Sequence, residues 1–203
     1  MLRRSEQKGF TLIEVMIAMA IFTVIVTIGI GAILDATSQH QRSKNMRSVM
    51  DNLNFVMEDM ARNIRLGSEV RCVTSANDIT YPGYIDNTGA IVAASCGGGS
   101  NKLIFRSLTG TPITYTISVP TTNTPSRIFK QVGDSSSAGV AKEISPEEVV
   151  IDFTRSGFTV TGAEPSDFQQ PIVTIRLAGI VTYKDQVSTF SIQTSVVLRQ
   201  LDS

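Results

Sequence analysis

The N-terminal part of the chain is dominated by one apolar run. Residues 10–34 are 25 consecutive positions with a single charged side chain, that of Glu14. As an α-helix this run would extend roughly 37 Å, which exceeds the hydrocarbon thickness of a bilayer. The pattern therefore predicts a membrane-spanning helix over residues 10–34.

Beyond the apolar run the chain becomes polar, but its apolar side chains keep a helical spacing of three or four residues. These apolar positions are Met46, Val49, Met50, Leu53, Val56, Met57, Met60 and Ile64. Arg62 and Arg65, followed by Gly67, are typical of the end of a helix. We therefore expect one continuous helix over about residues 10–66, amphipathic over 35–66. Packing on a sheet accounts for the methionines, and an adaptable binding groove is the alternative.

From residue 69 onward, short β-type runs alternate with segments rich in Gly, Pro, Asn and Ser. The expected strands are 69–74, 102–106, 113–119, 127–132, 149–154, 158–161, 172–183 and 187–199. A hairpin turn is expected around 184–186, and loops are expected around 87–100 and 134–146. The fold class predicted is α+β, in which the C-terminal half of the long helix packs on a mainly antiparallel β-sheet.

Basic side chains stand directly before the apolar run. Arg3, Arg4 and Lys8 favour a cytoplasmic location for residues 1–9 and export of everything after Leu34. No small-residue cleavage site of the secretory kind follows the run, so we expect it to be retained as an anchor.

Composition and charge exclude several classes of function. Eighteen basic and eighteen acidic residues balance, so no nucleic-acid partner is expected. His40 is the only histidine, no Gly-x-Ser-x-Gly sequence occurs, and two cysteines with one histidine make no zinc site. Residues 86–89 offer oxygen ligands without the spacing of an EF-hand loop, which indicates a turn. We expect no catalytic residues, no metal and no cofactor, and hence no enzyme.

The two cysteines, Cys72 and Cys96, both lie in the part expected to be exported. An oxidising compartment favours a disulfide between them, closing a loop of about 24 residues. Two unrelated buried thiols are the alternative.

Glu14 is the anomaly of the apolar run. A carboxylate at membrane depth costs at least about 2.5 to 3.5 kcal/mol and is usually functional. Either it has a cationic partner, or it lies close enough to the cytoplasmic interface to reach water.

The string KGFTLIEVMIA at residues 8–18 resembles the leader of type IV pilins and type II secretion pseudopilins. This resemblance implies that a prepilin peptidase cuts after Gly9 and methylates the new N-terminal residue, Phe10. The charged amine of Phe10 can then meet the Glu14 carboxylate of a neighbouring subunit, which would relieve a charge buried among apolar helices.

The same resemblance implies a pilin-like fold with four segments: a cytoplasmic leader (1–9, removed), a transmembrane and filament-core helix (10–34), its amphipathic continuation (35–66) and an exported β-rich domain (67–203). The chain is most similar to a minor pilin or a J-type minor pseudopilin. Its expected partners are prepilin peptidase, other pilin or pseudopilin subunits, an inner-membrane assembly platform and membrane lipid. Its expected location is the bacterial cytoplasmic membrane, then a pilus or pseudopilus. A single-span surface binding domain or enzyme that only shares the anchor is the alternative.

Overall fold

The computed structural model describes residues 9–73, 91, 93–133, 140–164, 168–183 and 186–199. The leader up to Lys8, the turn expected at 86–89 and residues 184–185 of the expected hairpin turn lie outside the described residues. The chain divides into two compact units, Met1–Asn45 and Met46–Ser203.

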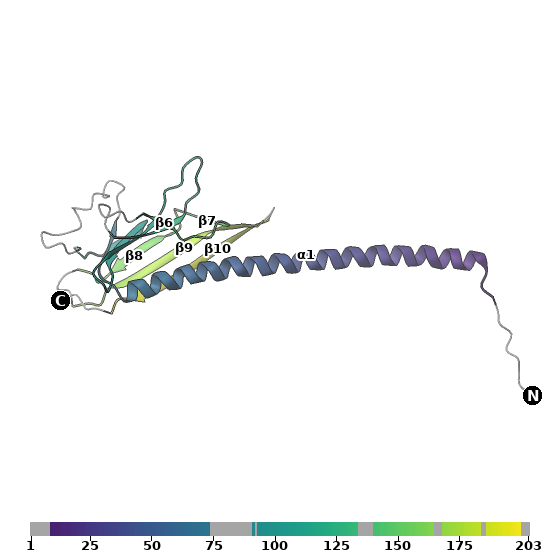
Figure 1. Ribbon diagram of the computed structural model, residues 1–203, viewed down its shortest axis with the longest axis horizontal. Coiled ribbons are helices and arrows are strands. Elements are labelled where there is room, and N and C mark those ends of the chain that lie inside the picture. Colours follow the sequence, from purple (N-terminus) through teal and green to yellow (C-terminus); the bar gives the residue numbers. More distant parts are fainter. Residues whose placement is uncertain are drawn as a thin grey trace, which may run out of the picture. The chain divides into compact units, whose positions relative to one another are not determined.

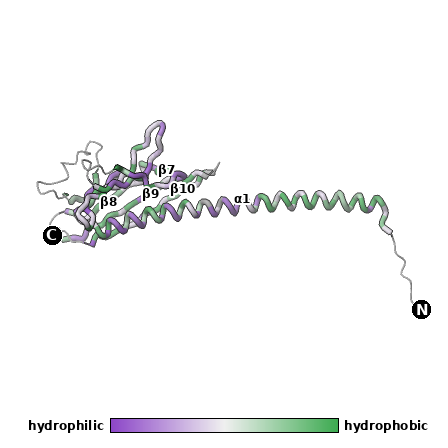
Figure 2. Tube along the Cα trace, viewed as in Figure 1, coloured by the Kyte–Doolittle hydropathy of each residue, from purple (hydrophilic) through white to green (hydrophobic). Residues whose placement is uncertain are grey.

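Helix α1 spans Leu12–Arg65 without interruption, which confirms the long helix expected from the sequence (Figure 1). Its hydropathy changes along its length, from an apolar first part to a mixed second part (Figure 2). Gly67 follows the helix end as expected, but its φ is not positive. A Cβ at this position would lie 2.5 Å from Cδ2 of Phe105, so close packing requires the glycine.

The strands form two antiparallel sheets. The first contains β1 (Ser68–Val73), β3 (Lys102–Arg106), β4 (Pro112–Ile117), β5 (Ile128–Val132) and β6 (Lys142–Glu143), in the order β1-β3-β4-β5-β6. The second contains β2 (Cys96–Ser100), β7 (Val149–Ile151), β8 (Gly157–Thr161), β9 (Ile172–Tyr183) and β10 (Gln186–Val197). Its order is β10-β9-β8-β2, with β7 also paired to β9. The α+β class is confirmed, with two sheets where the sequence predicted one.

Two short strands occupy segments that the sequence predicted as loops. Strand β6 lies in the expected loop 134–146, and β2 ends the expected loop 87–100. Pairing of β2 with β8 breaks register between Cys96 and Ser100. Gly98 and Gly99 have positive φ in this bulge. The sequence predicted a loop here because glycine has a low strand propensity. A β-bulge, however, accommodates glycine residues with positive φ.

One expected strand, 149–154, ends early at Ile151 because a turn follows it. The Asp152 carboxylate accepts hydrogen bonds from the backbone N–H groups of Thr154 and Arg155, at 3.0 and 3.2 Å, and from the Thr154 hydroxyl at 2.7 Å. These hydrogen bonds, led by that of the hydroxyl, lower the pKa of Asp152. The backbone N–H groups of Thr154 and Arg155 bond to this side chain instead of to a neighbouring strand, so the strand ends earlier than expected.

The larger of two buried apolar clusters joins the helix to both sheets. The buried helix positions are Val49, Leu53, Val56, Met57, Met60, Ala61 and Ile64. They share one cluster with Phe105 and Tyr115 from the first sheet and with Phe158 and Leu177 from the second. The methionines Met57 and Met60 therefore belong to the core, as the helix-on-sheet interpretation predicted.

Polar contacts fix the helix against the first sheet. Lys130 pairs with Asp59 at 2.9 Å and lies 5.7 Å from the centre of the Tyr115 ring. Asn63 donates to the Tyr115 hydroxyl at 3.2 Å. Burial, with the nearby Asp59 carboxylate, raises the pKa of Tyr115 well above its usual value. The phenol therefore stays protonated, and its hydroxyl remains paired inside the core.

A disulfide joins Cys72 of β1 to Cys96 of β2, with their Cα atoms 5.9 Å apart. It links the first sheet to the second. Next to it, an isolated parallel bridge joins Arg71 of β1 to Ala94, two residues before β2. The disulfide therefore lies where β1 of the first sheet comes close to β2 of the second.

Replacing the fully buried Leu53 is expected to weaken the β-rich unit. Leu53→Ala should lower the free energy of unfolding by about 2–5 kcal/mol, because it removes apolar contacts and leaves a cavity. Phe55→Ala is the matched control, since Phe55 is 75% exposed on the same helix and its loss should change stability by about 0.5 kcal/mol or less. Urea unfolding of the detergent-solubilised chain measures both, and equal losses would contradict this assignment of the buried helix face.

Removing the disulfide should destabilise the same unit. For a sequence separation of 24, the chain-entropy model gives a loss of roughly 3–4 kcal/mol in the double variant Cys72→Ser, Cys96→Ser. Alkylation followed by mass spectrometry checks the bond itself, because no thiol should react before reduction and two should react after it. Thiols that react without reduction would show that the bond does not form.

Candidate processing and assembly site

Gly9 and Phe10 lie outside the helix, immediately before it, and both are exposed. A Cβ placed on Gly9 would meet nothing within 4 Å, and the Phe10 side chain is 81% exposed. Proteolysis needs a peptide that a peptidase can reach, and the bond between these two residues is exposed and outside regular secondary structure.

Thr11 caps the beginning of α1. Its side-chain oxygen accepts the backbone N–H of Glu14 at 3.4 Å, and its carbonyl accepts the N–H groups of Glu14 and Val15 at 3.1 and 3.3 Å. Sequence reasoning missed this role of Thr11, although a threonine followed three residues later by glutamate is the signature of a capping box. The cap starts the helix at Leu12, two residues after Phe10.

The apolar part of α1 is uncovered within its own unit. None of its most apolar 18-residue window is buried, and by length and composition the helix can cross a membrane. Its threonines satisfy their hydroxyls within the helix, since Thr23 donates to Met19 O and Thr27 to Thr23 O, each at 2.8 Å. These residues therefore need no water, and the surface suits lipid or other apolar helices.

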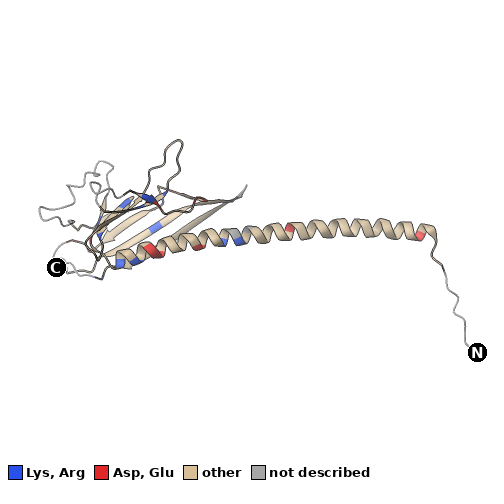
Figure 3. Cartoon of the chain, viewed as in Figure 1, with Lys and Arg blue, Asp and Glu red and all other residues tan. Residues whose placement is uncertain are grey.

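Glu14 is the exception on this surface. Between Glu14 and Asp35 the helix has no charged residue (Figure 3). Among the described residues, ion pairs join Glu69 to Arg106, Glu143 to Arg127 and Asp59 to Lys130, and none involves Glu14. Within the part of the chain that the structure describes, the Glu14 carboxylate thus has no cationic partner.

The sequence-predicted residues fall into two groups. Gly9, Phe10 and Glu14 lie together at the beginning of α1, in the first compact unit, whereas Cys72 and Cys96 lie in the second. No group of three or more His, Cys, Asp or Glu side chains that could hold a metal occurs among the described residues. The first group combines an accessible peptide bond with a lone carboxylate on an apolar helix, which suits processing and helix association.

Residues 4–34 match the family model of the prokaryotic N-terminal methylation motif. Neither a curated protein nor a solved structure matches the chain. The match includes Gly9, Phe10 and Glu14, and it is a motif at which prepilin peptidase processes its substrates. The motif at residues 4–34 and the long apolar helix that contains most of it support a type IV pilin-like protein.

Proposed function

We propose that this chain is a minor pilin or pseudopilin, a structural subunit of a type IV pilus-like or type II secretion filament. The observation that carries the proposal is the lone Glu14 carboxylate on an exposed apolar helix, directly after the accessible bond between Gly9 and Phe10. The protein acts by assembling and has no catalytic role.

Processing is the first step. Prepilin peptidase cuts after Gly9 on the cytoplasmic side and methylates the amine of Phe10. Support comes from the matched motif and from the position of this bond outside the capped helix. Residues 1–9 are removed, so the apolar helix becomes the N-terminal segment of the mature chain.

Before assembly, residues 10–34 hold the subunit in the cytoplasmic membrane. The cations Arg3, Arg4 and Lys8 keep the leader in the cytoplasm and place the β-rich unit outside. The disulfide between Cys72 and Cys96 suits an exported domain, because disulfides persist in oxidising compartments.

Assembly then moves the apolar helix from lipid to a bundle of helices. The charged amine of Phe10 on one subunit pairs with the Glu14 carboxylate of its neighbour, which makes burial of both charges tolerable and sets the axial register. Removing one partner of such a pair is costly, because the other charge stays buried alone.

Other features favour a minor subunit. A disulfide-linked unit with two five-stranded sheets offers lateral surface for specific neighbours. The proposed partners are prepilin peptidase, the other filament subunits and the inner-membrane assembly platform. A binding domain or enzyme that shared only the anchor would have no use for the unpaired Glu14.

Intact mass spectrometry of the membrane-extracted protein tests processing. With its prepilin peptidase present, the chain should lose residues 1–9 and carry one methyl group on Phe10. Gly9→Val should remain uncut because the larger side chain obstructs the peptidase, while the open surroundings of Gly9 leave the chain itself unstrained. Gly29→Ala, also in open surroundings, is the control and should be cut normally. An uncut leader beside an active peptidase would contradict the proposal.

Glu14→Gln tests the charge pairing. The variant keeps the size of the side chain and loses its charge, so leader removal should stay normal while incorporation into filaments falls at least about tenfold, consistent with the cost of an unpaired buried amine. Asp35→Asn is the control on the same helix and should assemble as the parent does. Quantitative immunoblotting of sheared filaments against whole membranes measures both, and full incorporation of Glu14→Gln would exclude this role.

A further inference from the structure

Strand β10 forms one edge of the second sheet. Along it, the backbone N–H and C=O groups of successive residues face alternately toward β9 and away from the sheet. Thr182 donates its N–H to Glu148 O and Ala178 O accepts from Asp152 N, so both β9 residues bond away from β10. Their partners in register are Val187 and Ser191. Because bonded and non-bonded pairs alternate in antiparallel strands, the odd-numbered residues from 187 to 197 direct their N–H and C=O groups outward. No backbone partner for these groups occurs among the described residues.

The other outer strands of the two sheets are short or irregular. β6 has two residues and β7 three, β2 contains the glycine bulge, and β1 has a register break near Glu69, whose φ is positive. Such features prevent edge-to-edge pairing. β10 has none of them, since its twelve residues contain no charge, proline or glycine and pair with β9 without a break.

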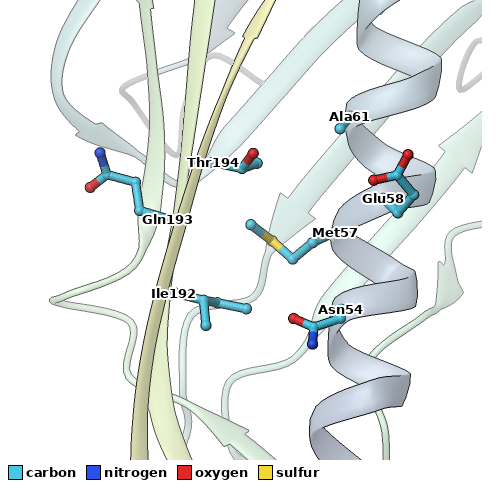
Figure 4. Close-up of a pocket in the computed structure, with 7 residues that line it drawn as sticks. All are labelled: Asn54, Met57, Glu58, Ala61, Ile192, Gln193 and Thr194. Atoms are coloured by element: carbon cyan, nitrogen blue, oxygen red, sulfur yellow. The ribbon is translucent and has the colours of Figure 1, made fainter.

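A groove of about 450 Å³ runs beside this open edge. Its walls come from α1 and β10 (Figure 4). Met57 points from the helix toward the strand, Ile192 and Thr194 point from the strand toward the helix, and Gln193 points away. A strand added to β10 would continue the sheet beneath the helix, and its inward side chains would enter this groove.

The rim of the groove carries an unmatched negative charge. Glu58 lines it together with Asn54 from the preceding helical turn. Within the described part of the chain, no ion pair or side-chain hydrogen bond involves the Glu58 carboxylate. The groove therefore suits an incoming strand with a lysine or arginine among small or apolar inward side chains. At one end, Arg199 N donates to Arg65 O and closes the gap between strand and helix.

We propose that β10 receives an extended segment of a different filament subunit, which adds to the second sheet as a further strand and places a basic side chain against Glu58. Only an extended backbone offers donors and acceptors at the spacing of the outward groups, which identifies the occupant as a peptide strand. The inference rests on the proposed function, because the partner is a subunit that meets this chain during assembly.

Hydrogen exchange of the full-length protein tests the strand addition. In the detergent-solubilised subunit, the amides of Val187, Ser191 and the other odd-numbered residues of β10 should exchange quickly, and those of even-numbered residues slowly. In purified filaments containing the subunit, the odd-numbered amides should exchange at least about tenfold more slowly. Unchanged exchange in filaments that contain the subunit would overturn the proposal. Protection that appears in the solubilised subunit alone as its concentration rises would identify a second copy as occupant, which also overturns it.

Ser191→Pro gives a second test with a matched control. Proline removes the outward N–H and is tolerated on the open side of an edge strand, so pairing with β9 should survive. Ser191→Ala changes the side chain and keeps the N–H. Filament incorporation should fall at least about fivefold in Ser191→Pro, with normal leader cleavage and a normal urea midpoint, and stay at the parental level in Ser191→Ala. Equal incorporation of the two variants would overturn the proposal.

Glu58→Lys tests the chemistry of the partner strand. Reversing the rim charge should lower incorporation, whereas parental incorporation would exclude the basic side chain. A parent chain that is not cut, or that never enters filaments, would overturn the proposed function and this inference together. A parent that assembles without protection of the odd-numbered amides would overturn this inference alone.

Discussion

The apolar surface of the first part of α1 is the constraint from which the rest of the molecule follows. Large side chains such as Leu12, Phe22 and Ile28 are mostly exposed, and the described residues of the first compact unit do not cover them. Such a surface is unstable in water, so it must lie in lipid or against other apolar helices. Both environments suit a helix whose backbone and threonine hydroxyls are satisfied internally, and both make an unpaired carboxylate costly.

The apolar surface around Glu14 is what makes its carboxylate exceptional. On a wet surface a glutamate near a helix N-terminus is ordinary and mildly stabilising. On this helix it is the one charge before Asp35, so it distinguishes one axial position from all others on a surface that is otherwise uniformly apolar. Apolar packing can hold such helices together, and in the proposed filament the charge would select the axial position of one helix against the next.

The second part of α1 differs from the first, because other residues of the same chain cover its apolar side chains. Leu53, Met60 and Ile64 are fully buried against two sheets, and the contacts of Asp59 and Asn63 with the first sheet fix which face of the helix turns inward. The disulfide between Cys72 and Cys96 then ties the two sheets together. The resulting unit has blunted edges except at β10, where an unbroken, uncharged strand borders a groove.

The sequence alone determined the helix, its apolar and amphipathic parts, the N-terminal motif and most of the strands, because these depend on local periodicity and on residues adjacent in the chain. It did not reveal that the strands divide into two sheets, that Gly97–99 belong to a strand, or that Gly67 is required by Phe105 rather than by a left-handed turn. Those features depend on contacts between residues distant in the chain. The open edge of β10 belongs to the same class, since a strand's sequence shows which side chains alternate, but only the pairing of the whole sheet shows which backbone groups are left without a partner.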